Sequence, residues 1–310
     1  VDMASTLQVD GIITVGDAAG GGTAGKIIYN AATAHSTEPY ISGNSTHAGM
    51  DFVSLASGGK NFFNSAGNFE VQIGSTNRLI IDSNSRISLS NNDSGVSNTI
   101  FGKLAGNLIG SGDNYNTFIG ENVADANMTN ATYNIGIGFE ALGGLTTGDS
   151  NTVVGSYAYT LASTGLNNVA IGHGAMNQVP AGQAVDGVVA VGFEALKGHS
   201  SNTTTGINGT VAIGDSALLA LTTGASNVAV GYTAGTALTI GRYNTVSGYE
   251  ALLTDDVGDG STAFGYQALK LQNSDSNNEA TGNTGIGYGT GLRNVTGQNN
   301  TYVGYQAGLG

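Results

Sequence analysis

The sequence predicts an all-β protein whose larger part is a parallel β-solenoid, and two observations lead to that prediction. The first is a phrase, Asn-Thr-x-(Ile/Val/Phe)-Gly-x-x-Ala, that recurs about a dozen times. Its copies begin at Asn98, Asn151, Asn168, Asn227, Asn283 and Asn300. The second is that these copies follow at a short, nearly fixed interval. A fixed short period is typical of a solenoid, because one repeat cannot bury its own apolar face and has to stack on its neighbours.

The glycine that closes each copy, called the anchor glycine below, gives the period. The anchor glycines stand at positions 102, 120, 138, 155, 172, 192, 214, 231, 248, 265, 287 and 304. Subtraction of neighbours gives intervals of 18, 18, 17, 17, 20, 22, 17, 17, 17, 22 and 17. A second glycine lies seven residues before many anchors, at 95, 148, 165, 224, 241, 258 and 297. The base unit is therefore 17 or 18 residues, lengthened three times.

Composition limits the classes of function. The chain has 310 residues with 51 Gly, two Pro and no Cys, so disulfides, thiol chemistry and cysteine metal sites are excluded. A net charge of −13 disfavours nucleic acid and anionic membranes as partners. The chain contains no run of eighteen apolar residues, so no membrane span is predicted. The chain starts without Met and shows no signal peptide, and it stops just after a complete phrase, so we expect a processed product or a segment of something longer.

Residues 1–97 lack the repeat and are expected to form an extended β leader or shaft region. Short strands are predicted at 5–15, 26–29, 51–55, 68–73, 77–82 and 86–90. Polar turns separate the last three, and an Asp-Gly pair interrupts the first. The domain boundary is therefore placed between residues 97 and 98.

Residues 98–310 are expected to be the repeat solenoid of about twelve coils. Each coil would use the Asn-Thr-x-Ile-Gly phrase as one short strand and the following Ala-Leu pair, such as Ala141-Leu142, as a second. Small or branched residues are expected to point inward with period two. Twelve coils at roughly 4.8 Å each would make a rod about 58 Å long. The extra residues of the long coils, at 178–186, 199–205 and 273–281, are expected to be irregular and exposed.

The Asn at the start of the phrase predicts a hydrogen-bonded ladder at one corner of the coil. A polar side chain that recurs at one buried position has to be satisfied by hydrogen bonds. Three coils depart from the pattern, with Val188, Thr210 and Ser261 in the Asn position.

An aromatic stripe follows the anchor glycine. Tyr232, Tyr249, Tyr266, Tyr288 and Tyr305 hold this position in five successive coils, and Phe139, His173 and Phe193 hold it earlier. Aromatic rings stacked in register contribute about 0.5–1.5 kcal/mol per pair. The stripe has two interpretations, a sugar-binding face or packing within the coil and between protomers, and packing is favoured.

The carboxylates do not predict an active site. Glu140, Glu194 and Glu250 follow anchor glycines in coils three apart, which places them roughly 14 Å from one another. Glycoside hydrolysis needs two carboxyl groups about 5–9.5 Å apart. We therefore expect a protein that is not an enzyme and that needs no cofactor.

No metal site is predicted either. Asp255, Asp256 and Asp259 form the densest acidic cluster, and either a cation or a solvated turn would account for it, the turn being favoured. The four histidines have no metal-ligand spacing. An ice-binding face is a further alternative that the Thr positions support poorly, because Ile135, Val169 and Val228 interrupt them.

The repeat resembles those of bacteriophage tail fibre proteins. The resemblance rests on Gly304–Gly308, on Thr222–Asn227 and on a leader segment at 77–87. The phrase is also similar to the head repeats of trimeric autotransporter adhesins, whose three chains form parallel β-rolls. The unit here is longer than the adhesin unit, and the coils at Val188 and Thr210 lack the Asn.

The resemblance implies a homotrimeric fibre segment of a phage tail or virion that takes part in host attachment or holds a receptor-binding tip away from the particle. Its implied partners are further copies of itself, other virion proteins and a host-surface glycan or protein, and its implied location is the virion or an extracellular surface. A thin 17-residue coil also favours a trimer, because one chain has little core of its own. The alternatives are the head of a bacterial surface adhesin, a glycan-degrading tailspike enzyme and an ice-binding solenoid.

Overall fold

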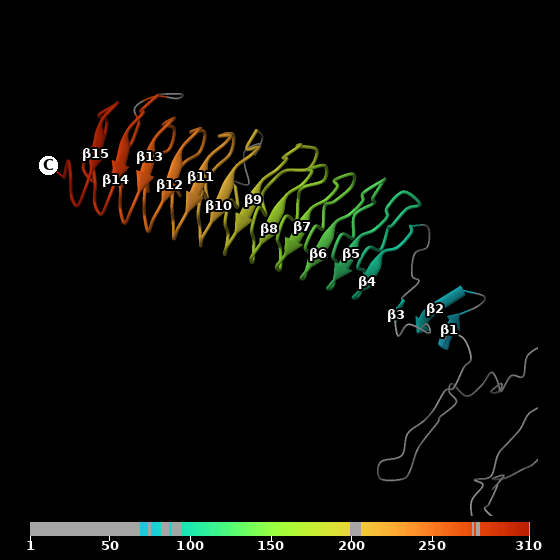
Figure 1. The fold of residues 1–310 in the computed structure, drawn as a ribbon. Coiled ribbons are helices and arrows are strands. Elements are labelled where there is room, and N and C mark those ends of the chain that lie inside the picture. The colour runs from blue at the N-terminus through green and yellow to red at the C-terminus, as the bar shows by residue number, and fades with distance from the viewer. Residues whose placement is uncertain are drawn as a thin grey trace, which may run out of the picture. The chain divides into compact units, whose positions relative to one another are not determined.

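The structure is a computed structural model, and it describes residues 69–73, 76–81, 87–88, 95–198, 206–274, 276 and 280–309. The chain divides into two compact units, Val1–Asn64 and Ser65–Gly310, and all described residues belong to the second. Within that unit lie a small antiparallel sheet and a long stack of parallel strands (Figure 1).

The small sheet contains β1 (Phe69–Ile73), β2 (Thr76–Ile81) and β3 (Ile87–Ser88) in the order β1-β2-β3. Both pairs are antiparallel, and the register between β1 and β2 shifts at Val71/Gln72. The three strands predicted from the leader at 68–73, 77–82 and 86–90 are thereby confirmed. The strands predicted at 5–15, 26–29 and 51–55 lie outside the described residues.

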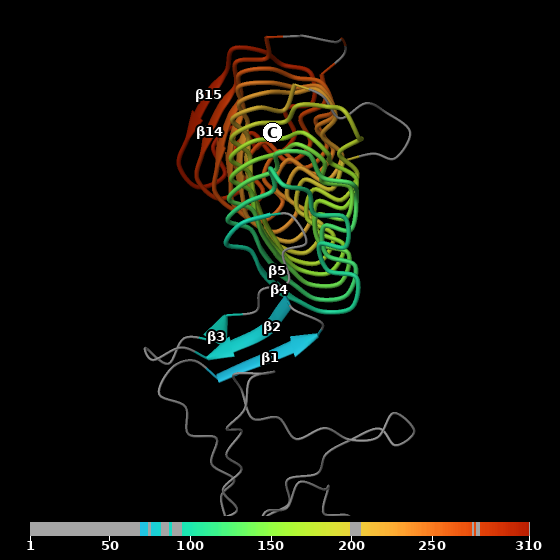
Figure 2. The ribbon, with the colours of Figure 1, turned by 90° about the vertical axis from the view of Figure 1, so that its right-hand side faces the viewer.

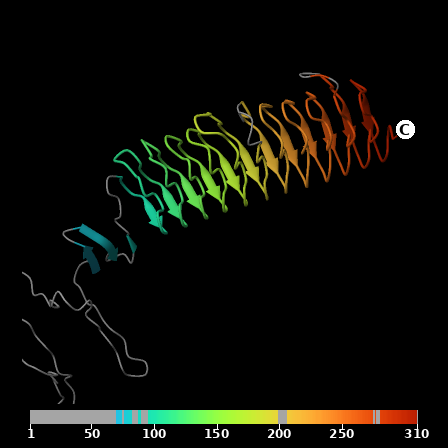
Figure 3. The same cartoon turned by 180° about the vertical axis from the view of Figure 1, so that it is seen from behind.

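The repeat forms one sheet of twelve parallel strands, each three residues long (Figures 1 and 3). They are β4 (Thr99–Phe101), β5 (Thr117–Ile119), β6 (Ile135–Ile137), β7 (Thr152–Val154), β8 (Val169–Ile171), β9 (Val189–Val191), β10 (Val211–Ile213), β11 (Val228–Val230), β12 (Thr245–Ser247), β13 (Thr262–Phe264), β14 (Thr284–Ile286) and β15 (Thr301–Val303). Each strand pairs with the next along the chain, and equivalent residues of the phrase lie opposite each other. The predicted parallel β-solenoid is confirmed.

One chain closes each coil by itself. Figure 2 shows the successive coils as loops lying one behind another. An anchor glycine follows every strand directly, and all twelve have φ between +117° and +142°. Only glycine adopts this backbone conformation readily, so the strand ends and the chain turns at the same place in each coil.

The predicted second strand at the Ala-Leu pair is wrong. Each repeat has one strand in the described part of the solenoid, apart from an isolated bridge between Asp259 and Ala280. Ala141 and Leu142 lie in a turn, and Leu142 has φ 56°. The equivalent residues in other coils, Leu218 among them, have the same left-handed backbone. A strand needs extended φ, so this position cannot join a second sheet.

The solenoid interior is filled by two kinds of position. The middle residue of each strand points inward, as Val153, Ala170 and Ala212 do, and these side chains are fully buried. The Ala-Leu turns supply the rest of the core, with Ala217 and Leu218 also fully buried. The core therefore forms without a second chain.

The period-two pattern is confirmed, but the expectation that branched residues point inward is only partly correct. The Ile or Val before the anchor glycine faces outward, and Ile171 and Ile213 are each 38% exposed. The middle residue points inward instead. It is Gly, Ala or Val in nine of the twelve strands, and Phe118 shows that a larger side chain can also be fully buried there.

The extra residues of the long coils are less exposed than predicted. In the segment 178–186, Val179 and Val185 are fully buried, and only residues near the tip, such as Gly182, are open. In the segment 273–281, Ser274 and Thr281 are buried, whereas Asn273, Ser276 and Ala280 are exposed as predicted. The segment 199–205 lies outside the described residues.

Candidate binding surface

The asparagine ladder fixes one corner of the solenoid and so aligns the surfaces described below. Asn151 shows the pattern: its Oδ1 accepts a hydrogen bond from the Asn168 backbone N–H at 3.0 Å, and its Nδ2 donates to the Gly165 carbonyl at 2.8 Å. The Asn134 Oδ1 in turn accepts from the Asn151 backbone N–H at 3.0 Å. These side chains are fully buried. The ladder predicted from the sequence is confirmed.

The ladder is interrupted where the sequence lacks Asn. At Ser261 the side chain of Gln272, which was not predicted to take part, replaces the missing asparagine amide. Gln272 donates to the Ser261 Oγ at 2.9 Å and accepts from the Asn283 Nδ2 at 2.9 Å. At Thr210, by contrast, the hydroxyl is buried and has no hydrogen-bond partner. Thr210 is therefore a weak point in the stack.

Substitution of Thr210 by asparagine is expected to stabilise the protein by about 1–2 kcal/mol. In regular coils the Asn Oδ1 accepts a hydrogen bond from the backbone N–H of the equivalent residue in the next coil, which here is Asn227. The substitution would supply this acceptor and would remove the buried, unsatisfied hydroxyl of Thr210. The midpoint of urea unfolding measures the effect. Thr245→Asn, the same change at an exposed strand position, should give no gain, and equal gains at both positions would contradict this account.

The outer face of the twelve-stranded sheet is uncharged and mostly apolar, with Val, Ile or Phe at sixteen of its 24 outward positions and Thr or Ser at the other eight. Two side chains of every strand point outward, and all of them are Thr, Val, Ile, Phe or Ser. The exposed fraction reaches 58% at Phe264 and 64% at Val303. This face was not predicted from the sequence. The regular placement of Ala, Gly or Val in the middle of the phrase was the signal that the flanking Ile and Val point the other way.

The last five residues of the aromatic stripe, which follow the ends of strands β11 to β15, form a continuous ladder. The rings of Tyr232, Tyr249, Tyr266, Tyr288 and Tyr305 have centroid separations of 5.3, 5.3, 4.8 and 5.3 Å, with interplanar angles of 7–19°. The predicted stacking is confirmed, and we call these five residues the tyrosine ladder. Each ring face lies against its neighbour, so a ligand at this site would meet ring edges and hydroxyl groups.

The same column is irregular in earlier coils. His173 stacks on Phe193 at 5.6 Å, while Ser156 and Asp215 hold this position in the coils on either side of them. Tyr157 lies one residue further along its coil and meets His173 edge to face at 5.8 Å. A separate stacked pair, Tyr115 and Tyr133, lies in the column just before the asparagine ladder with a centroid separation of 5.0 Å. This pair has the stacking geometry of the tyrosine ladder but is only two rings long.

Polar side chains flank the tyrosine ladder at Glu250. Its carboxylate accepts hydrogen bonds from the Gln267 Nε2 at 2.8 Å and from the Lys270 Nζ. The hydrogen bonds from Lys270 and Gln267 hold the pKa of Glu250 below its usual value. The nearby Glu250 charge raises the pKa of the Tyr249 hydroxyl. Glu250 and Lys270 neutralise each other, so the surroundings of Tyr249 carry little net charge, whereas Asp215 holds the post-glycine position in the coil before Tyr232.

The acidic cluster does not converge on one point. Asp255 is fully buried and accepts hydrogen bonds from the Ser274 Oγ at 2.8 Å and the Gly258 N–H at 3.2 Å, whereas Asp256 is exposed. Asp259 accepts from the Arg242 backbone N–H at 2.7 Å. Within the described ranges, no group of three His, Cys, Asp or Glu side chains could hold a metal ion. Glu194 is paired with Lys197 at 2.7 Å.

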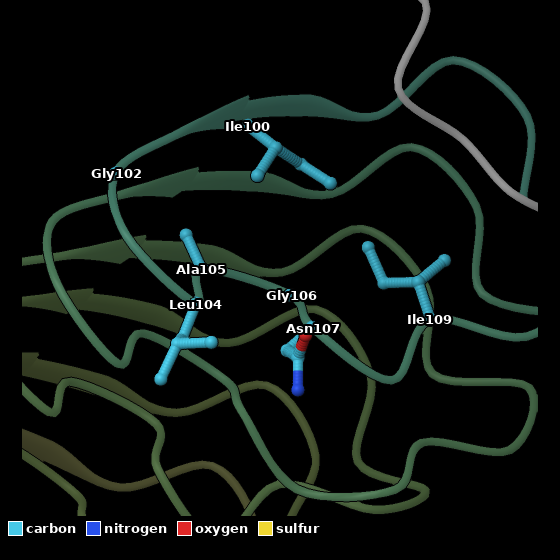
Figure 4. Close-up of a pocket in the computed structure, with 7 residues that line it drawn as sticks. All are labelled: Ile100, Gly102, Leu104, Ala105, Gly106, Asn107 and Ile109. Atoms are coloured by element: carbon cyan, nitrogen blue, oxygen red, sulfur yellow. The ribbon is translucent and has the colours of Figure 1, made fainter.

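A hollow of about 190 Å³ lies at the first coil (Figure 4). Its lining consists of Ile100, Gly102, Leu104, Ala105, Gly106, Asn107 and Ile109. It holds no ionisable side chain, so it offers no acid–base chemistry.

Comparison with known proteins gave no relatives, since no family model, curated protein or solved structure matches the chain. In the part of the chain that the structure describes, there is no helix long and apolar enough to cross a membrane.

Proposed function

We propose that the chain is a non-enzymatic structural segment of a phage tail or virion fibre, that it assembles as a homotrimer, and that it serves host attachment or spaces a receptor-binding tip. The observation that carries this proposal is the uncharged outer face of the sheet. It extends over all twelve strands, from Phe101 to Val303. The largest apolar patch on a protein surface is often a functional contact surface.

Charge supports association through this face. The chain has a net charge of −13, so copies repel each other over most orientations. Both outward columns of the sheet lack charged residues, and contact along them brings no carboxylates of the strands together. The interface would run along the stacking direction of the coils. The assembled form would therefore be a long shaft in which the chains lie side by side.

The size of the face sets how many coils an interface along it would need. Twelve three-residue strands cover roughly 10 Å by 53 Å, or about 530 Å² of flat sheet. This area is smaller than the roughly 800 Å² per partner of a standard specific interface, so residues beside the strip would have to take part in the contact. An interface along the strip would use most of the coils. This agrees with the sequence, in which no coil places a charged residue on the outer face.

The acids support a role without catalysis. Glu194 and Glu250 each form an ion pair with a lysine, and Asp255 uses its oxygens within the core. None of these three carboxylates faces another of them across a groove. Paired carboxylates at a groove are what a glycan-degrading enzyme would require.

The test is the mass of the intact chain by light scattering without denaturant. A mass near three times the 31.0 kDa chain is expected, because three copies can bury their sheet faces around one axis. Ile213→Lys places a charge on the outer face and should shift the particle toward monomer. A monomeric wild type would contradict the homotrimer.

The matched control is Leu161→Lys. Leu161 is 46% exposed against 38% for Ile213, so both changes disturb folding little. Leu161 lies six residues past an anchor glycine, in the returning part of the coil, and its substitution should leave the mass unchanged. Equal dissociation by both variants would mean that charge, and not the sheet face, controls assembly.

A further inference from the structure

The tyrosine ladder presents a regular row of hydroxyl groups. Its rings are 39–74% exposed although their faces are stacked on one another. Stacking consumes the faces, so the exposed parts are the ring edges and the phenolic oxygens. A phenol hydroxyl both donates and accepts a hydrogen bond. The row therefore offers one phenolic hydroxyl in each of five successive coils, and that of Tyr249 is hydrogen-bonded to Glu250.

The spacing of this row selects the shape of its ligand. Ring centroids follow at 4.8–5.3 Å over five coils. A ligand that bonds every ring must repeat its own hydroxyl groups at nearly the same interval and must stay straight. An extended polysaccharide has this property, because each sugar presents hydroxyls at a constant advance along the chain. A helical polysaccharide turns its hydroxyls away after one or two sugars.

The side chains beside the ladder are of the kind that bind sugars. Gln306 lies next to Tyr305, and its exposed amide can donate and accept. Gln267 lies next to Tyr266, and because its Nε2 donates to Glu250 at 2.8 Å, it offers its carbonyl oxygen as an acceptor. Glu250, which follows Tyr249, has its charge compensated by Lys270. A neutral chain meets no repulsion here, whereas a polyanion would face a protein with a net charge of −13.

We propose that the tyrosine ladder binds an extended, uncharged polysaccharide that lies parallel to the stack, with one sugar on each coil. The inference rests on the attachment role proposed above, for which it supplies the chemistry of the receptor. The ladder borders the apolar sheet face, and the rim of a protein interface stays accessible to solvent. Trimer formation and glycan binding are therefore compatible on neighbouring surfaces.

The experiment is calorimetric titration of the intact chain with six-sugar probes. Cellohexaose and chitohexaose are the extended probes, and maltohexaose is the helical one. Binding of an extended probe, with none by maltohexaose, is expected. Tyr266→Phe removes one hydroxyl and keeps the stack, so it should raise the Kd about fivefold, as the loss of one hydrogen bond does. Tyr133→Phe, in the two-ring pair, should leave the Kd unchanged.

The results test the polysaccharide site separately from the homotrimeric fibre. No binding of any probe by a chain of trimeric mass overturns the ladder site and leaves the structural fibre. Unchanged affinity in Tyr266→Phe, or equal affinity for maltohexaose, also overturns it. A monomer that binds cellohexaose and loses affinity in Tyr266→Phe supports the ladder and contradicts the homotrimer.

Discussion

Replacement of Gly231 by alanine is expected to destabilise the solenoid by about 3–5 kcal/mol. Gly231 has φ +139°, and a Cβ there would lie 2.5 Å from the carbonyl oxygen of Gly248 in the next coil. The added atom would collide with backbone, so no side chain can move to make room. Equilibrium unfolding in urea, followed by circular dichroism, measures the loss.

Gly304→Ala separates backbone strain from the collision of the added Cβ with the next coil. Gly304 has φ +117°, close to that of the other anchors, but a Cβ added there would meet nothing within 4 Å, because no coil follows it in the structure. This variant keeps the backbone strain and lacks the collision, and it should lose only about 1–2 kcal/mol. Equal losses at both positions would show that strain alone selects glycine at the anchor.

Substitution of Asn151 by alanine is expected to cost about 3–4 kcal/mol. The change removes the acceptor of the Asn168 backbone N–H and the donor to the Gly165 carbonyl. Both groups are in the buried corner of the coil, and each unsatisfied group costs about 1–3 kcal/mol. Thermal unfolding followed by tyrosine fluorescence, which no tryptophan obscures, measures the effect.

The control for the asparagine ladder is Asn177→Ala. The Asn177 Nδ2 donates to the Tyr157 carbonyl at 2.8 Å, but the side chain is only half-buried. Water can replace this partner, so a loss below about 1 kcal/mol is expected. If Asn151→Ala were equally mild, the ladder would be a by-product of the repeat and would not hold the corner together.

The backbone periodicity was predictable because it follows from residue types with strict local demands. Gly231 and its equivalents occupy a φ that other residues avoid, and Asn151 occupies a site where a buried amide has to satisfy two backbone groups. Both demands recur along the coils. Counting those residues therefore located all twelve parallel strands.

The turn after the anchor glycine was not predictable in the same way. Leu142 and Leu218 have left-handed backbone at φ 56° and 49°, although leucine has no local preference for it. Burial of the side chain in the core offsets the backbone cost. That gain exists only when neighbouring coils are in place, so the sequence pattern suggested a strand.

The sequence by itself determined the repeat length, the strand positions, the asparagine ladder and the stacking of the tyrosines. Only the tertiary structure decided which side of the strand faces the core, and hence that Ile213 lies on an open apolar face. It also decided that Tyr266 offers an edge and not a ring face. The reason is physical: period and backbone conformation are properties of one coil, whereas exposure depends on what the next coil and the opposite turn already cover.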